Sequence, residues 1–131
     1  SVTGVQTCAL PIFFSFAEGT RFTEKKKIDQ SSEFGNLLNP KTGGIGLTLT
    51  TMPYIKLLLD FSIHYEDERR SFWDFLCGRL SHVNVKARLI DIPQNLLGKS
   101  YEDDPVFREE LKQWMNGIWS EKDRYLEEKT K

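Results

Sequence analysis

The clearest pattern of hydrophobic and polar positions lies near the end of the chain and predicts an amphipathic helix. Asp104 is a suitable N-cap, and Pro105 suits the first helical position because that position needs no backbone N–H donor. The helix is expected to pack across the sheet of its own domain, although partner-binding and membrane-surface helices have the same pattern. Its hydrophobic positions are Phe107, Leu111, Trp114, Met115, Ile118, Tyr125 and Leu126.

Three other segments have strand patterns. Residues 55–65 are almost continuously apolar, which predicts a strand covered on both faces, as in a parallel or mixed sheet. Residues 83–92 alternate between apolar and polar side chains, which predicts a half-exposed strand. Residues 13–16 are rich in aromatic side chains and lead to a turn at Gly19, which favours a buried strand.

Shorter elements connect these segments. Residues 45–52 predict a short helix that Pro53 ends, and residues 71–79 predict a short helix or lid. Residues 21–39 are mainly polar and predict a surface loop with one helical turn. We therefore expect one domain of the α/β class, with helices flanking a sheet.

Composition excludes several functions. The 18 Lys and Arg against 19 Asp and Glu give a net charge of -1, too little field to gather nucleic acid, so no nucleic-acid partner is expected. Cys8 and Cys77 have no metal-ligand spacing and form no disulfide framework, which favours a reducing compartment. We expect no metal and no cofactor. The sequence contains no transmembrane segment, because its apolar runs are too short.

Chemically useful groups gather just after residues 13–16. Gly19 lets the backbone turn and approach a ligand, and Arg21 has a planar charged group that binds phosphate with two hydrogen bonds. Thr20 adds a hydroxyl or backbone N–H, and Glu18 is placed to orient Arg21 or to accept a hydrogen bond from a substrate hydroxyl. A simple turn with a Glu–Arg ion pair is the alternative for these four residues in isolation.

Residues 16–22 resemble the F-P-E-G-T-R motif of the lysophospholipid acyltransferase family, which includes the 1-acylglycerol-3-phosphate acyltransferases. In that family the motif helps to bind the glycerol-phosphate part of the acceptor, and its arginine contacts the phosphate. The resemblance implies these roles for Glu18, Gly19, Thr20 and Arg21. The chain departs from the motif at Ala17, where the family usually has proline; the turn loosens slightly, and every polar group is kept.

The resemblance extends over nearly all of residues 13–131. Residues 38–44, 76–81 and 114–123 look like segments of the bacterial membrane-bound branch of the family. It implies the C-terminal part of a single acyltransferase domain, with an incomplete glycerolipid acyltransferase-type sheet. Within residues 38–44, Lys41 is a candidate second phosphate contact, against the alternative of a solvated turn lysine.

The family's catalytic motif, His-x-x-x-x-Asp, is absent from this chain. Arg69 stands five residues after His64, and Ala87 stands five residues after His82. We therefore expect no catalytic residue here, and both histidines are predicted to be structural ones with satisfied hydrogen bonds. A base formed by His64 with Asp67 or Glu66 is an alternative that nothing in the sequence holds near the E-G-T-R segment.

The resemblance implies a function for the parent protein: transfer of an acyl group from acyl-CoA or acyl carrier protein to a lysophospholipid such as lysophosphatidic acid. It also implies a membrane surface as partner and a location at the cytoplasmic face of the inner membrane. A non-catalytic α/β module that binds phosphate or a protein partner is the alternative for the chain as given.

The start of the chain resembles a segment of separate origin. Residues 2–12 look like the translation of a common sequencing adapter, so we expect residues 1–12 to be a non-native segment and the natural sequence to begin near Phe13. The resemblance implies that preceding strands and helices are missing, which would leave sheet edges and apolar faces uncovered. We therefore expect a poorly soluble or partly molten chain.

Overall fold

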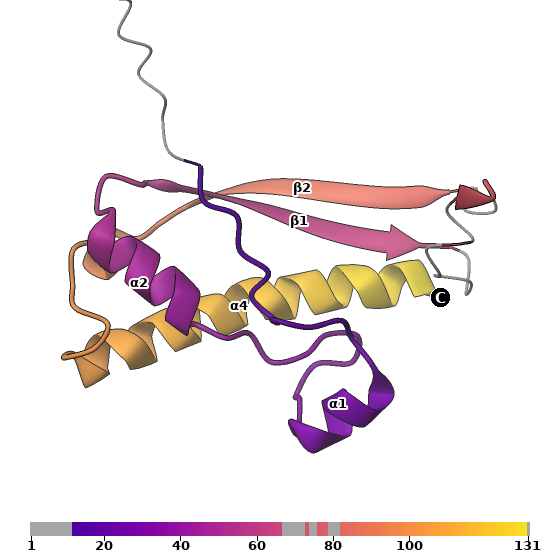
Figure 1. Ribbon diagram of the computed structural model, residues 1–131, viewed down its shortest axis with the longest axis horizontal. Helices are drawn as coiled ribbons and strands as arrows, with labels where there is room; N and C mark the ends of the chain where they lie inside the picture. Colours follow the sequence, from indigo (N-terminus) through magenta and orange to yellow (C-terminus); the bar gives the residue numbers. More distant parts are fainter. Residues whose placement is uncertain (1–11, 67–72, 74–75, 79–81, 131) are drawn as a thin grey trace, which may run out of the picture.

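The computed structural model describes residues 12–66, 73, 76–78 and 82–130. Their fold is mixed helix and antiparallel sheet, which agrees with the predicted α/β class at that level (Figure 1). The elements in chain order are helix α1 (Glu24–Asp29), helix α2 (Gly43–Thr51), strand β1 (Leu57–Tyr65), strand β2 (Val83–Asp91), the 3-10 helix η1 (Gln94–Leu96) and helix α4 (Pro105–Thr130).

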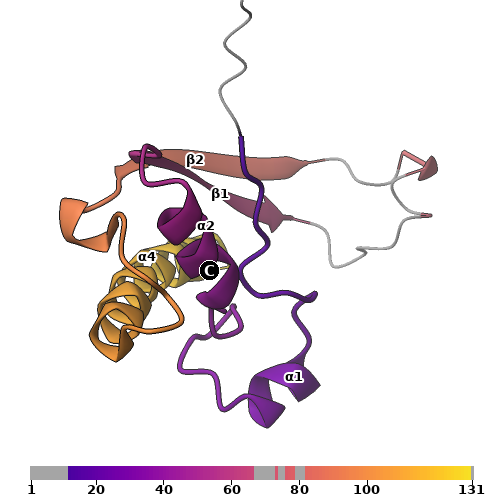
Figure 2. The same ribbon diagram turned by 60° about the vertical axis from the view of Figure 1, so that its left-hand side comes forward.

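The sheet consists of β1 and β2 among the described residues, and the two strands are antiparallel. Their register runs from the pair Leu57 and Asp91 to the pair Tyr65 and Val83. Helix α4 packs beneath the sheet against β1 and η1, and α2 lies at one end of the same layer (Figures 1 and 2). The prediction of a parallel or mixed sheet for residues 55–65 is therefore wrong for this part of the chain.

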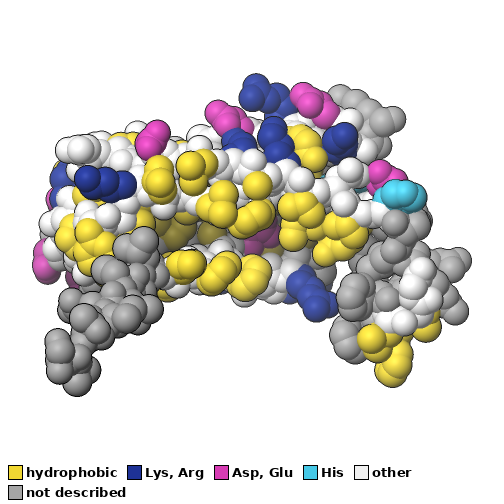
Figure 3. Space-filling view, turned by 90° about the horizontal axis from the view of Figure 1, so that it is seen from above, with side chains coloured by type: hydrophobic (Ala, Val, Ile, Leu, Met, Phe, Trp, Pro, Cys, Tyr) yellow, Lys and Arg dark blue, Asp and Glu magenta, His cyan; other side chains and the backbone are white. Residues whose placement is uncertain are grey.

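The two faces of the sheet differ in what covers them. Because side chains alternate along a strand, Leu59, Phe61 and Ile63 share one face, and about half of each remains exposed. Figure 3 looks onto this face and shows hydrophobic side chains gathered along the strands. Asp60 and Ser62 point to the other face and are buried. The predicted coverage of both faces is wrong here, because the described residues provide a helix on one face only.

Buried charges join the covered face of the sheet to α4. Nη2 of Arg88 donates to Asp60 Oδ2 at 2.8 Å, and the same guanidinium also forms an ion pair with Glu121. The ammonium of Lys122 lies 2.6 Å from Asp60 Oδ1 and donates to the carbonyl of Phe61 at 3.0 Å. A polar strand face is thus compatible with burial, because every charge in it has a partner.

Helix α4 begins as its sequence predicts. Asp104 Oδ1 accepts from the backbone N–H groups of Val106 at 2.9 Å and Phe107 at 3.0 Å, so it caps the first turn. The predicted hydrophobic face is confirmed, and Trp119, which was not predicted on that face, is buried with it. The core around this helix consists of Ala17, Phe34, Leu37, Ile45, Leu49, Ile92, Leu96, Phe107, Leu111, Met115, Ile118, Trp119 and Leu126.

Other predicted elements are confirmed in part. Helix α2 agrees with the helix expected at 45–52, and α1 is the helical turn expected within 21–39. The half-exposed strand expected at 83–92 is β2. The helix or lid expected at 71–79 lies largely outside the described residues.

The strand expected at residues 13–16 is not formed. The segment is irregular and its side chains are exposed, with Phe16 at 91%. A strand requires a neighbour to pair with its N–H and C=O groups, and no strand among the described residues pairs with this segment. Local aromatic content was therefore not enough to build a strand.

Candidate functional site

The predicted E-G-T-R segment forms a tight turn fixed to the core. The N–H of Gly19 donates to the carbonyl of Phe16 at 2.8 Å, and the side chain of Ala17 is buried in the core cluster. The N–H of Lys41 donates to the carbonyl of Ala17 at 2.7 Å. The chain segment that precedes α2 is thereby held against the turn.

Gly19 is suited to its position for two reasons. Its φ is +68°, a conformation that residues with a Cβ rarely adopt. A Cβ at this position would also lie 3.2 Å from Nζ of Lys41. The structure therefore brings together two of the predicted site residues, Gly19 and Lys41, which the sequence separates.

Thr20 and Arg21 contact a lysine that sequence reasoning did not select. Nζ of Lys26 donates to Thr20 Oγ1 at 2.6 Å and to the carbonyl of Arg21 at 3.3 Å. Lys26 belongs to α1, whose first turn is capped by Thr23 Oγ1, which accepts from the N–H of Lys26 at 3.3 Å. The short helix therefore positions this ammonium group over the turn.

The side chains of Glu18 and Arg21 do not pair. Both residues lie in the described part of the chain, where no ion pair joins them and where the exposed guanidinium of Arg21 forms no ion pair. The Glu–Arg ion pair considered for this turn is thus not present. The cation is free to bind a ligand.

Glu18 is turned toward α4 instead. Burial raises the pKa of its carboxyl above the usual range, and the Leu38 amide, the Lys122 charge and the Trp119 indole partly oppose this by stabilising the charged form. Nε1 of Trp119 is buried near this carboxyl, and it forms no hydrogen bond within the described residues. Glu18 therefore links the turn to α4, and Lys122 and Trp119 are residues that the sequence did not connect to the site.

The histidines lie elsewhere, at the end of the sheet where β1 stops and β2 starts. His82 is exposed, with Nδ1 3.9 Å from Glu66 Oε2. Nδ1 of His64 is buried and has no partner in the part of the chain that the structure describes. The prediction that both histidines have satisfied hydrogen bonds is therefore wrong for His64. Asp67 lies outside the described residues.

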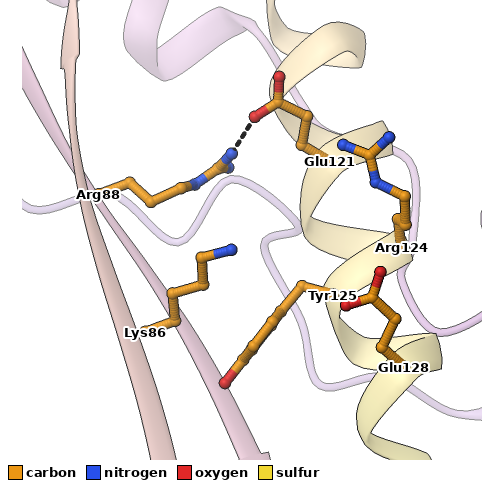
Figure 4. A pocket seen from close by; sticks show the side chains of 6 residues that line it. All are labelled: Lys86, Arg88, Glu121, Arg124, Tyr125 and Glu128. Atoms are coloured by element: carbon orange, nitrogen blue, oxygen red, sulfur yellow. Dashed lines mark hydrogen bonds and ion pairs between the residues drawn. The ribbon is translucent and has the colours of Figure 1, made fainter.

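A hollow of about 430 Å³ lies between β2 and α4 (Figure 4). Two carboxylates line it together with three cationic groups, so that an anion would be repelled as well as attracted. One of the cations, Lys86, lies over the Tyr125 ring at 4.6 Å from its centroid. None of the predicted site residues is among those that line the hollow: Lys86, Arg88, Glu121, Arg124, Tyr125 and Glu128.

Two other kinds of site are absent from the described ranges. No group of three or more His, Cys, Asp or Glu side chains there is arranged to hold a metal ion. No helix there is both long and apolar enough to cross a membrane. Cys77 is an exposed free thiol, and Cys8 lies outside the described residues.

Comparison with known proteins gives weak but consistent matches. The chain is similar to 1-acyl-sn-glycerol-3-phosphate acyltransferase delta of Homo sapiens, with 26% identity over 126 residues, which is 88% of this chain and 31% of that protein. The protein of the same name from Mus musculus is 26% identical over 127 residues, which is 89% of this chain and 31% of that protein. The chain thus spans 31% of the length of these curated relatives. No family model and no solved structure matches it. The similarity supports an acyltransferase family.

Proposed function

We propose that residues 13–131 are the C-terminal part of a single lysophospholipid acyltransferase domain and that residues 1–12 are a non-native segment. The whole protein transfers an acyl group from acyl-CoA or acyl carrier protein to a lysophospholipid, of which lysophosphatidic acid is the best candidate. Within this chain, Glu18, Gly19, Thr20, Arg21 and Lys41 bind the glycerol-phosphate part of the acceptor, and the chain itself does not catalyse acyl transfer.

The observation that carries the proposal is the geometry of the turn at Gly19. The turn presents the unpaired guanidinium of Arg21, and the ammonium of Lys41 lies against the position of Gly19. An exposed arginine beside a second cation suits a phosphate group, which accepts charge-assisted hydrogen bonds from both. The names of the relatives, 1-acyl-sn-glycerol-3-phosphate acyltransferases, support the same acceptor.

Acyl transfer also requires a general base for the acceptor hydroxyl. Neither histidine of this chain is followed at the required spacing by an aspartate, and both lie at the far end of the sheet hairpin. The base therefore belongs to another part of the whole protein in this proposal. The same part would complete a glycerolipid acyltransferase-type sheet beside β1 and β2.

The proposal includes a location for the whole protein. A lysophospholipid acceptor lies in a membrane surface, and the resemblance to the bacterial branch of the family implies the cytoplasmic face of the inner membrane. The bacterial branch is part of the proposal and rests on residues 38–44, 76–81 and 114–123.

Sequencing the source locus upstream of Phe13 tests whether residues 1–12 are non-native and whether the chain is part of a longer acyltransferase. An upstream reading frame with a His-x-x-x-x-Asp motif is expected. Genuine coding sequence for Ser1 to Ile12, with a start codon there, would contradict both parts of the proposal.

Binding of glycerol 3-phosphate to the chain tests the site directly. Titration followed by two-dimensional NMR is expected to shift the backbone signals of residues 16–21 and 41, and Arg21→Ala should weaken the affinity about tenfold or more, the loss of one charged hydrogen-bonding partner. Arg124→Ala is the matched control, because Arg124 is also exposed and lines the hollow between β2 and α4. Loss of binding in Arg124→Ala but not in Arg21→Ala would move the phosphate site to that hollow.

Turnover separates binding from catalysis. The purified chain, supplied with lysophosphatidic acid and acyl-CoA or acyl carrier protein, is expected to form no phosphatidic acid above the background rate. Acyl transfer that Arg21→Ala abolishes would overturn the assignment of the chain as non-catalytic.

A further inference from the structure

Three cations from separate stretches of the chain surround the turn at Gly19 and Thr20. Arg21 follows the turn directly, Lys41 lies beside Gly19, and Lys26 reaches Thr20 from α1. The contacted residues are neighbours whose Cα atoms are about 3.8 Å apart, so the lysines flank the same short piece of backbone. Two lysines thus contact the turn that Arg21 follows directly, and we call Arg21, Lys26 and Lys41 the cationic cluster.

The position of Lys26 differs from that of the adjacent lysines. Lys25 is exposed, and its side chain forms no hydrogen bond or ion pair within the described residues. Nζ of Lys27 donates to the carbonyl of Gly35 at 2.7 Å, away from the turn. Lys26 is half-buried, and its two partners are the neutral oxygens of Thr20 and Arg21. An ammonium group has three donors, so one N–H of Lys26 is left for a ligand.

No carboxylate neutralises the cluster. Among the described residues, Arg21, Lys26 and Lys41 take part in no ion pair. Of the carboxylates near them in sequence, Glu18 is turned toward α4, and the exposed Glu24 in the first turn of α1 pairs with none of the three cations. Like charges that share a small region repel one another, and a bound anion relieves that repulsion. The arrangement therefore favours an anion with several acceptor oxygens, such as a phosphate monoester.

The bond from Lys26 also sets the direction of the Thr20 hydroxyl. Thr20 Oγ1 accepts the N–H of Lys26 at 2.6 Å, so the hydroxyl hydrogen is free to donate in another direction. A phosphate at the turn can then receive hydrogen bonds from the Thr20 hydroxyl, the third N–H of Lys26 and the Arg21 guanidinium. Each of these donors matches an acceptor oxygen of phosphate.

We propose that Lys26 is a third phosphate-binding cation, which contacts the ligand and orients the Thr20 hydroxyl toward it. The inference deepens the proposed function, on which it rests: it adds a residue from α1 to the site and assigns that residue a charge-dependent role. The ligand class is a phosphate monoester, from a lipid headgroup or as free phosphate.

Substitutions at Lys26 separate its charge from its hydrogen bond. Lys26→Gln keeps a donor for Thr20 but removes the charge, and it is expected to weaken glycerol 3-phosphate binding about tenfold in an NMR or calorimetric titration. Lys26→Arg keeps the charge and is expected to retain most of the affinity. Lys25→Gln is the matched control, because it removes the same charge one residue away. It should change the affinity less than twofold.

The possible results have distinct meanings. If Lys26→Gln binds as tightly as Lys25→Gln while Arg21→Ala is impaired, the inference about Lys26 is wrong and the proposed function stands. If Arg21→Ala binds normally, the proposed function fails. If Lys26→Arg loses as much affinity as Lys26→Gln, with an unchanged unfolding temperature, the size and geometry of the lysine side chain matter and its charge does not. That result overturns the inference.

Two ligands distinguish the source of the phosphate. Binding of inorganic phosphate measures the affinity of the cationic cluster for phosphate alone. Glycerol 3-phosphate also carries the glycerol part of a lipid headgroup. Tighter binding of glycerol 3-phosphate, with the same loss in Lys26→Gln for both ligands, is expected for a headgroup site. Equal affinities, with that same loss, would identify a site for free phosphate, and binding of neither ligand by the native chain would overturn the inference.

Discussion

Gly46 shows how a single residue fixes the segment that carries Lys41. An added Cβ at Gly46 would lie 2.0 Å from Cδ2 of Tyr101, so the absence of a side chain lets α2 approach that ring. The hydroxyl of Tyr101 also forms a 3.0 Å hydrogen bond with Thr42, the residue after Lys41. The contact at Gly46 therefore helps to place Lys41 beside the turn.

Gly46→Ala is expected to lower the free energy of unfolding by about 1–3 kcal/mol, because Tyr101 must move to admit the methyl group. Gly44→Ala is the control, since nothing lies within 4 Å of its added Cβ and alanine favours a helix. Urea unfolding of both variants checks this. Equal free energies for the two would show that Tyr101 adapts without cost.

Between elements, the contact of β1 and β2 with α4 depends on charges as well as on apolar packing. Asp60 is 8% exposed and forms ion pairs with two cations, Arg88 from β2 and Lys122 from α4. Lys122 also lies over the ring of Trp119 at 4.8 Å from its centroid and stabilises the charged form of Glu18. The same lysine therefore connects the sheet, the helix and the candidate site.

Asp60→Ala is expected to lower the free energy of unfolding by about 3–5 kcal/mol, because it leaves Arg88 and Lys122 largely buried without their carboxylate. Asp91→Ala, on the exposed end of β2, is the control and should change it by less than about 0.5 kcal/mol. Denaturant titration followed by circular dichroism measures both. A small effect at Asp60 would mean that water or Glu121 replaces the lost carboxylate.

For the molecule as a whole, the apolar face of the sheet that no helix covers among the described residues is the feature that most affects solubility. Seven hydrophobic side chains of the two strands are roughly half exposed or more, and they lie on one surface (Figure 3). Contiguous apolar surface of this kind lowers solubility. The residues are Leu57, Leu59, Phe61, Ile63, Val83, Val85 and Leu89.

Replacing Phe61 and Ile63 together by threonine is expected to raise the solubility of the chain, because threonine keeps the strand propensity and removes apolar surface. The control replaces Ile28 and Val106 by threonine; they are 75% and 65% exposed but lie on different helices. Static light scattering against concentration measures the difference. Equal scattering by both double variants would show that the sheet face does not control association.

The sequence predicted those elements that are specified by residue types and spacing within one short segment. Asp104, Pro105 and the helical spacing of apolar residues defined α4, and the alternation in residues 83–92 defined β2. The aromatic run at 13–16 failed because a strand depends on a partner strand, which no local pattern supplies. The predicted coverage of both faces of residues 55–65 failed for a related reason. The buried face carries Asp60, and this carboxylate is stable there because Arg88 and Lys122 pair with it from other elements.

The sequence by itself determined the chemistry available at the candidate site, because the types and order of Glu18, Gly19, Thr20 and Arg21 are contained in one short segment. Only the tertiary structure decided which other groups join that segment. Lys41 arrives through a backbone hydrogen bond to Ala17, and Lys26 is selected from three consecutive lysines by the direction of α1. The physical reason is that charges act through space over a few ångströms, and only the fold sets those distances.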